Sequence, residues 1–252
     1  FSSDGIQLFG GSNVIEGNYI GTDATGMTDL GNAFNGITIR SSNNLIGGTT
    51  ATARNVIAGN NRGIDIDTGS VNLIQGNYIG VNVAGTTAVG NSNTGVSVTN
   101  SSNNTIGGTI VGARNIISGN GGSGVSLWGL NVIATNNLVA GNLIGTDKTG
   151  SVDLGNGIDG INLSIGANGN QIGAIGAGNV ISGNEQNGVF IQSDSNLVLG
   201  NRIGINEAGT AALGNTGNGV FVYGQSNSNT NNNIIGGTLV GSEHIIANNG
   251  RG

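Results

Sequence analysis

Apolar residues alternate with variable residues in eight short segments of the chain, and a glycine directly precedes each segment. The first segment reads Gly5-Ile6-Gln7-Leu8, and Ile, Val or Leu fills the two apolar positions in the other seven. Alternation with a period of two is typical of a strand that has one buried face. The pattern therefore predicts strands at 6–8, 37–39, 64–66, 96–98, 125–127, 161–163, 189–191 and 220–222.

The spacing of these glycines predicts a repeat architecture. Successive glycines are separated by 31, 27, 32, 29, 36, 28 and 31 residues. Long and short intervals alternate, so the repeating unit contains two turns of the chain. We expect one domain covering 1–252, built from four repeats at 5–62, 63–123, 124–187 and 188–251.

Asparagine and glycine separate the apolar segments at matching places in every repeat. Both residue types allow tight turns through positive φ. Equivalent residues of successive turns would stack about 4.8 Å apart, where Asn side chains can hydrogen-bond along a ladder. The sequence predicts an all-β, parallel solenoid of about eight rungs, roughly 40 Å long, without helical caps. The predicted ladder residues are Asn18, Asn77, Asn142, Asn201, Asn32, Asn91, Asn156 and Asn215.

Composition narrows the possible partners. The chain has 252 residues, 51 of them Gly, and no Pro or Cys. High Gly content suggests disorder, but a disordered chain has no reason to keep its apolar residues in register. The net charge of −6 and only seven Lys or Arg argue against a nucleic-acid partner. No apolar run approaches the ~18 residues of a membrane span.

Several segments resemble a known repeat. These are GNYIG at 17–21 and 76–80, NNTIGGT at 103–109 and GARNIISGN at 112–120. They resemble the parallel β-helix repeats of the pectate-lyase-like superfamily, in the Asn/Gly-rich version of large secreted bacterial surface proteins. The resemblance implies a right-handed helix, which agrees with the usual crossover rule, and an extracellular or cell-surface location. It does not single out an activity, because this architecture hosts lyases, hydrolases, adhesins and passive stalks.

The outward positions of the predicted strands hold the candidate chemistry. Asp65 and Asp67 are two residues apart, so both carboxylates would point outward, about 7 Å from each other. Arg40 would lie one rung below Asp67. Paired carboxylates are what glycoside hydrolysis requires, so Asp65, Asp67 and Arg40 are the catalytic candidates. The candidates for stacking on sugar rings are Trp128, Phe190, Phe221 and Tyr223.

A simpler interpretation of the same face is a solvated surface with one Arg–Asp pair and aromatic side chains that cover a sheet. We favour it, because these columns contain no His or Lys that could serve as a base. The predicted loops also contain no insertion that would form the walls of a cleft. The one histidine, His244, lies in the last rung and is expected to be structural.

The turn after each GNYIG-type segment is a second candidate site. An Asp or Asn occupies the same turn position in all four repeats. A Ca²⁺ site needs several oxygens at one point, and one residue per turn supplies too few. We therefore expect Asx turns that cap their own backbone, and neither a metal nor a cofactor. The four residues are Asp23, Asn82, Asp147 and Asn206.

Two further features complete the expectations. Arg54 and Arg114 occupy equivalent positions and are expected to be corner residues that pack or bond to backbone. Gly252 matches a ninth strand-preceding glycine, and Phe1 lies four residues before the first. Open rungs can pair with other strands, so the sequence predicts either a longer array or end-to-end stacking of copies into a filament.

The first functional expectation is a structural module of a secreted or cell-surface protein, a rigid rod or stalk with itself or neighbouring repeats as partner. The alternative is a carbohydrate-binding or polysaccharide-cleaving β-helix that uses the face around Asp65, Asp67 and Trp128. The sequence leaves enzymatic activity undecided and favours its absence.

Overall fold

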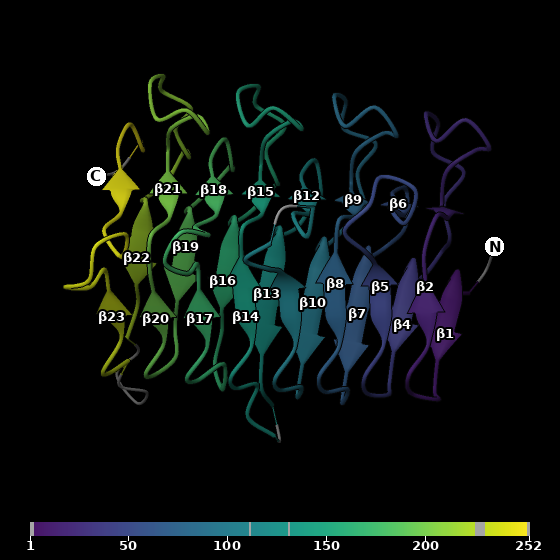
Figure 1. Cartoon of the computed structure of the whole chain (residues 1–252), viewed down its shortest axis with the longest axis horizontal. Coiled ribbons are helices and arrows are strands. Elements are labelled where there is room, and N and C mark those ends of the chain that lie inside the picture. Colours follow the sequence, from purple (N-terminus) through teal and green to yellow (C-terminus); the bar gives the residue numbers. More distant parts are fainter. Residues whose placement is uncertain (1–2, 111, 131, 225–229, 251–252) are drawn as a thin grey trace.

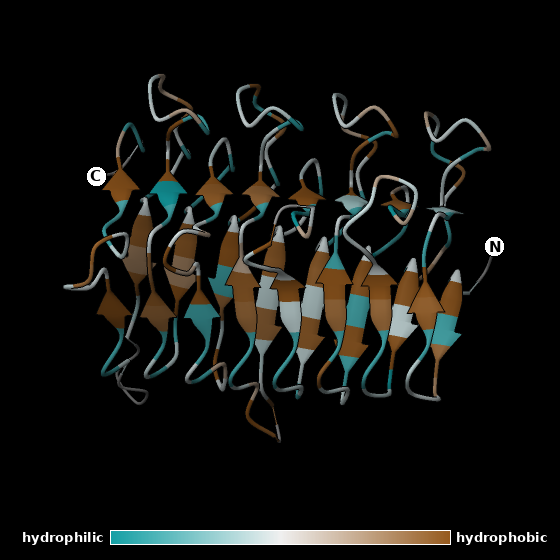
Figure 2. Ribbon diagram, in the orientation of Figure 1, coloured by the Kyte–Doolittle hydropathy of each residue, from teal (hydrophilic) through white to brown (hydrophobic). Residues whose placement is uncertain are grey.

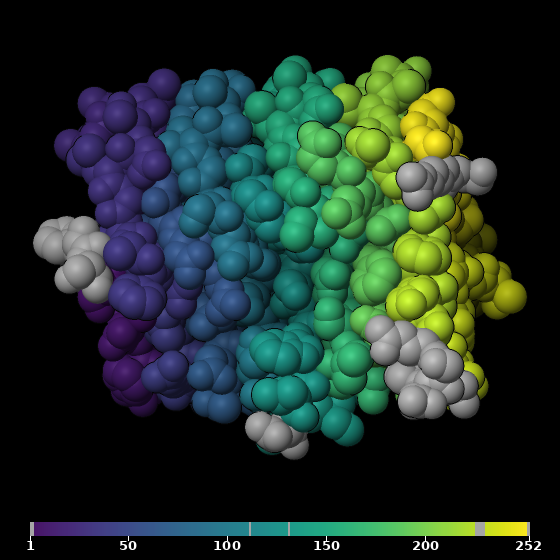
Figure 3. Space-filling model, turned by 180° about the vertical axis from the view of Figure 1, so that it is seen from behind, coloured from purple at the N-terminus to yellow at the C-terminus, as the bar shows by residue number. Residues whose placement is uncertain are grey.

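The strands of this protein stack into a parallel solenoid. The structure is a computed structural model and describes residues 3–110, 112–130, 132–224 and 230–250. These residues form 24 short strands in three parallel sheets of eight, with no helix among them. Successive rungs lie side by side along the long axis, and they cross the molecule as bands in sequence order (Figures 1 and 3). The predicted all-β parallel solenoid is confirmed.

Each rung contributes one strand to each sheet. Sheet A contains β1 (Ile6–Leu8), β4 (Ile37–Ile39), β7 (Ile64–Asp67), β10 (Val96–Thr99), β13 (Val125–Trp128), β16 (Ile161–Leu163), β19 (Val189–Ile191) and β22 (Val220–Val222). Sheet B contains β2 (Val14–Ile15), β5 (Leu45–Gly47), β8 (Leu73–Gln75), β11 (Thr105–Gly107), β14 (Leu138–Ala140), β17 (Gln171–Ile172), β20 (Leu197–Val198) and β23 (Ile234–Ile235). Sheet C contains β3 (Tyr19–Ile20), β6 (Val56–Ile57), β9 (Tyr78–Ile79), β12 (Ile116–Ile117), β15 (Leu143–Ile144), β18 (Val180–Ile181), β21 (Arg202–Ile203) and β24 (Ile245–Ile246).

The core is a stack of apolar residues inside the three sheets. Sheet A supplies two inward residues per rung, such as Ile37 and Ile39, while sheets B and C supply one each, such as Ile46 and Ile57. All four are fully buried. The apolar stripes run from strand to strand in Figure 2. Burying one such side chain contributes about 1.5–3 kcal/mol, so the repeated pattern specifies the register of every rung.

Four long turns form a second layer over sheet C, at the top of Figure 1. The turns cover 22–31, 81–90, 146–155 and 205–214, and a short antiparallel bridge closes each one. Each turn bonds to the preceding one; for example, the N–H of Lys148 donates to the carbonyl of Gly85 at 2.8 Å. Between the turns and sheet C lies a small apolar core of Val56, Tyr78, Val81, Ile116, Leu143 and Val180.

The last glycine of the GNYIG segments is required by backbone geometry. Gly80 has φ of +84°, and a Cβ there would lie 2.2 Å from the carbonyl oxygen of Ser118 in the next rung. The segment therefore marks the turn out of sheet C. The predicted ninth glycine, Gly252, and Phe1 lie outside the described residues. Within the described ranges, no helix is long and apolar enough to cross a membrane.

Candidate functional site

Asparagines form three ladders along the solenoid, and those of the interior rungs are buried. The first ladder contains Asn13, Asn44, Asn72, Asn104, Asn137, Asn170, Asn196 and Asn233. The second contains Asn18, Asn55, Asn77, Asn115, Asn142, Asn179 and Asn201. The third contains Asn32, Asn60, Asn91, Asn120, Asn156, Asn184, Asn215 and Asn249. The predicted asparagines are alternate members of the second and third ladders, so the ladders are denser than the sequence pattern suggested.

Asn142 illustrates how one ladder position is satisfied. Its Nδ2 donates to Oδ1 of Asn179 at 3.0 Å and to the carbonyl of Ile106 at 2.9 Å. Its Oδ1 accepts from the backbone N–H and from Nδ2 of Asn115, at 3.2 and 3.0 Å. The amide therefore links its own rung to both neighbouring rungs. It also satisfies backbone hydrogen-bonding groups that have no strand partner at this corner.

His244 takes the eighth place in the second ladder. Its Nδ1 accepts from the backbone N–H of Asn201 at 3.0 Å, where an Asn would use Oδ1. Its Nε2 lies 2.9 Å from the carbonyl of Val198, where an Asn would donate from Nδ2. The structural role predicted for His244 is confirmed, and its form is the replacement of an amide by an imidazole.

The acidic candidates on sheet A are both held in ion pairs. Nε of Arg40 lies 3.2 Å from Asp67, the pair expected between neighbouring rungs. Nη1 of Arg62 lies 3.2 Å from Asp65, a partner that the sequence analysis did not identify. No group of three or more His, Cys, Asp or Glu residues that could hold a metal occurs in the part of the chain that the structure describes.

Asp65 is less accessible than predicted. The residue is only 8% exposed, and Thr38 and Ser97, on either side of it in the same column, are also buried. Burial raises the pKa of Asp65, and the nearby Arg62 guanidinium opposes this effect only in part. The outward column was expected to be open to solvent. Side chains stacked at the strand spacing shield one another, so this column is exposed only at its two ends, at Gln7 and Phe221.

The aromatic candidates fall into two groups. Phe190, Phe221 and Tyr223 pack together, with ring centroids 5.7–6.2 Å apart. Trp128 lies apart from them and is 39% exposed. In the sheet register it follows Thr99 and Asp67 in one column. The face therefore presents a column of polar side chains that is interrupted by an exposed indole.

The four Asx residues cap their own turns, as predicted. Oδ1 of Asp147 accepts the backbone N–H groups of Ser151 and Val152, both at 3.1 Å. Oδ1 of Asn82 accepts the corresponding N–H groups of its own turn. Burial raises the pKa of Asp147, but the bonds from the Thr149 hydroxyl and these N–H groups outweigh burial, so its pKa is lowered overall. Each turn uses its Asx oxygen internally, which explains the aligned positions without a metal.

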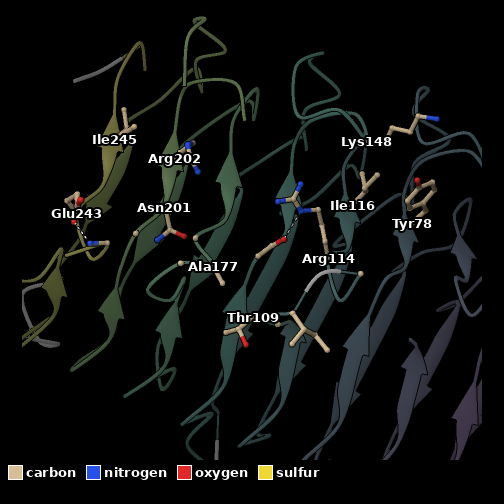
Figure 4. A pocket seen from close by; sticks show the side chains of 18 of the residues that line it. Tyr78, Thr109, Arg114, Ile116, Lys148, Ala177, Asn201, Arg202, Glu243 and Ile245 are labelled. Carbon is tan, nitrogen blue, oxygen red and sulfur yellow. Dashed lines mark hydrogen bonds between the residues drawn. The ribbon is translucent and has the colours of Figure 1, made fainter. Parts of the chain in front are cut away.

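A groove runs beside sheet C, and the sequence analysis missed it. It has a volume of about 750 Å³ and lies between the turns over sheet C and the loops that join sheets B and C. Its charged lining residues are Arg54, Arg114, Lys148, Arg202 and Glu243 (Figure 4). In the sequence, only the equivalent positions of Arg54 and Arg114 indicated this groove. Lys148 and Arg202 come from unrelated positions of the repeat, so the repeat pattern does not group them with the other two.

Arg54 and Arg114 are corner residues that bond to backbone, as predicted. Nε of Arg54 donates to the carbonyl of Gly76 at 3.3 Å, and its guanidinium stacks 4.0 Å from the ring centroid of Tyr78. Nε of Arg114 donates to the carbonyl of Gly141 at 3.0 Å, and its Nη1 pairs with Glu207. These contacts fix both side chains at the groove.

Comparisons with protein-family models, with curated proteins and with solved structures found no match. The stacked sheets and ladders therefore assign the chain to the parallel β-solenoids by architecture alone.

Proposed function

We propose that this chain is a structural solenoid module, a rigid rod or stalk of a secreted or cell-surface protein. The observation that carries the proposal is the set of three asparagine ladders, which join neighbouring rungs along the whole stack. Bending or shearing the stack would break buried amide hydrogen bonds that water cannot replace. A hydrogen-bond network of this kind suits a spacer that must keep its length under tension.

The last described rung supports stacking on a further rung. Its inward residues Val222, Ile235 and Ile246 are 41, 44 and 45% exposed, whereas the equivalent residues one rung earlier are fully buried. An exposed set of core positions is a surface that another rung of the same pattern would cover. Neighbouring repeats and a second copy of the chain are the two partners with that pattern. The Asn/Gly-rich repeats that the sequence resembles occur in large secreted surface proteins, which motivates the proposed location.

Single-molecule force spectroscopy tests the rod. The chain is stretched by its two ends, and we expect discrete unfolding peaks as rungs detach. The variant Asn142→Ala should lower the peak force in the middle of the stack, while the exposed Asn18→Ala should not. A chain that extends without force peaks would contradict the proposal. Electron microscopy at micromolar concentration tests self-stacking separately, and monomers at every concentration would remove that part.

A second candidate function is carbohydrate binding on the outer face of sheet A. The exposed indole of Trp128 follows Arg40, Asp67 and Thr99 in one column, a combination of polar groups and a flat apolar ring that suits a sugar. The ion pairs of Asp65 and Asp67 favour binding over cleavage. A glycan screen with Trp128→Ala tests it, with Tyr19→Ala, an exposed aromatic on sheet C, as the control. Binding that both variants retain would reject this face as the site.

A further inference from the structure

The groove beside sheet C collects most of the positive charge of the protein. Four of the seven Lys and Arg residues line it, but only one of the thirteen Asp and Glu residues does. The remainder of this acidic chain is therefore strongly negative. A concentration of one sign of charge in a concave site raises the local concentration of ligands of the opposite sign.

Three of these cations are available to a ligand. Arg54, Lys148 and Arg202 form no ion pair in the described ranges. Nε of Arg202 is buried and has no hydrogen-bond partner among the described residues. This nitrogen is shielded from solvent, so a ligand would contact the part of the Arg202 side chain that remains accessible in the groove. The fourth cation, Arg114, is already paired with Glu207.

The cations are arranged along the solenoid axis. Arg54 directly precedes the ladder residue before β6, Arg114 holds the same place before β12, and Arg202 begins β21. Neighbouring strands of sheet C are about 4.8 Å apart. Arg54 and Arg114 are therefore about 10 Å apart along the axis, and Arg202 lies about 14 Å further on. Lys148, in the turn after β15, leans back over β9: its N–H donates to the carbonyl of Gly85, and its side chain lies above Tyr78, on the Arg54 side of Arg114 (Figure 4). A small anion could reach one or two of these groups, whereas an extended chain with repeated charges could reach all of them.

The walls of the groove distinguish between classes of polyanion. Glycines line much of it, at Gly108, Gly112, Gly141, Gly176, Gly178, Gly200 and Gly241. Their lack of side chains leaves room for rings against the backbone. The strands of the floor from β6 to β21 pair on both sides, so an extended peptide finds no free edge there. The one aromatic lining residue, Tyr78, is buried beneath Arg54 and offers no platform for stacking bases.

We propose that this groove binds a linear anionic polysaccharide, whose carboxylate or sulfate groups pair with Arg54, Lys148 and Arg202. Guanidinium groups suit both anions because their forked N–H donors match two oxygens at once. The site lies on sheet C, away from the Asp65 and Asp67 face. The inference goes beyond the structural role and does not depend on it, since a rod without this ligand would still stretch with force peaks.

Isothermal titration calorimetry with four polymers tests the groove. Alginate carries carboxylates, dextran sulfate carries sulfates, dextran is the uncharged form of the same backbone, and single-stranded RNA represents nucleic acid. We expect at least one anionic polysaccharide to bind, with affinity that falls as salt rises to roughly 0.2 M, and dextran not to bind. Comparing alginate with dextran sulfate identifies the preferred anion.

Two charge-removing variants and one control make the test specific. Lys148→Gln and Arg202→Gln should each weaken binding by roughly tenfold, the loss of one charge-assisted contact. Arg62→Gln removes the same charge outside the groove and should leave binding unchanged. Lys148 is exposed, so its variant remains a test if Arg202→Gln impairs folding. The inference is overturned if neither anionic polysaccharide binds at low salt, if Arg62→Gln weakens binding equally, or if RNA binds more tightly than both.

Discussion

Truncating one interior ladder residue should destabilise the solenoid far more than truncating an exposed one. In Asn142→Ala, the backbone N–H and one amide N–H of Asn115 lose their acceptor. Asn115 is fully buried, so water cannot replace the lost oxygen. The carbonyl of Ile106 also loses a donor.

The magnitude follows from the number of buried groups left without a partner. Each unsatisfied buried donor costs about 1–3 kcal/mol, so the two donors of Asn115 together cost about 2–6 kcal/mol. Domains of this size are stable by about 5–15 kcal/mol, so the variant should lose a large part of its stability. Asn18 begins the same ladder, is exposed, and accepts no ladder bond in the described residues. Asn18→Ala should therefore cost less than about 1 kcal/mol.

Urea unfolding followed by circular dichroism measures both variants against the native chain. We expect a clear decrease in the midpoint for Asn142→Ala and a small one for Asn18→Ala. Repeat proteins can unfold in several steps, so midpoints are compared at each transition rather than from one extrapolated free energy. Equal midpoints for the two variants would refute the conclusion that interior ladder bonds hold the rungs together.

Four further variants test other parts of the fold. Gly80→Ala combines a positive φ with a clash against the Ser118 carbonyl and should lower the free energy of unfolding by about 3 kcal/mol or more. Gly176 also has a positive φ, but a Cβ there meets open space, so Gly176→Ala should lower it by about 1–2 kcal/mol. Similar urea midpoints for the two variants would contradict this reasoning. Asp147→Asn should keep its turn and remain within about 0.5 kcal/mol of the native chain at neutral pH. Because the folded-state pKa of Asp147 is lowered below its usual 3.8, the native chain loses this contribution as pH falls through that pKa, and the variant should be less acid-sensitive in thermal melts. The pKa of Asp65 is raised above 3.8, so the native chain loses stability as pH rises through the folded-state pKa of this carboxyl. The melting temperature of Asp65→Asn, taken relative to that of the native chain, should therefore rise over that pH window. A fall would show that the ion pair with Arg62 dominates.

The parts of the fold that repeat were predictable from the sequence. Glycine before an apolar alternation located every strand of sheet A, because an inward residue such as Ile64 meets an equivalent residue in each neighbouring rung. Asparagine at recurring places predicted the ladders for the same reason. Asn55, Asn115 and Asn179 of the second ladder were missed. Each lies 37 or 38 residues after one member and only 22 or 27 before the next, so the intervals along the ladder are uneven in the sequence.

Features that depend on contacts between non-equivalent positions of the repeat were not predictable from the sequence. The turns over sheet C touch one another across two rungs, so their apolar residues, such as Val81, looked like ordinary turn residues. The burial of Asp65 depends on its neighbours Thr38 and Ser97 and on Arg62. Alternation correctly placed its side chain on the outward face, but it could not state how much of that face the stacked neighbours cover.

The repeat also indicates where a ligand can be selected. Positions that are the same in every rung hold core side chains or ladder asparagines, and a substitution there lowers the stability of the fold. Two charges of the groove stand where the rungs differ. Lys148 holds the place of Val83 in the preceding turn, and Arg202 stands where the other strands of sheet C begin with tyrosine, leucine, valine or isoleucine. Both exceptions face the same groove as Arg54 and Arg114. Residues that differ from the repeat at unrelated positions and still meet on one surface are the pattern that ligand binding would produce. Without a common ligand, such residues would be spread over the three sheets.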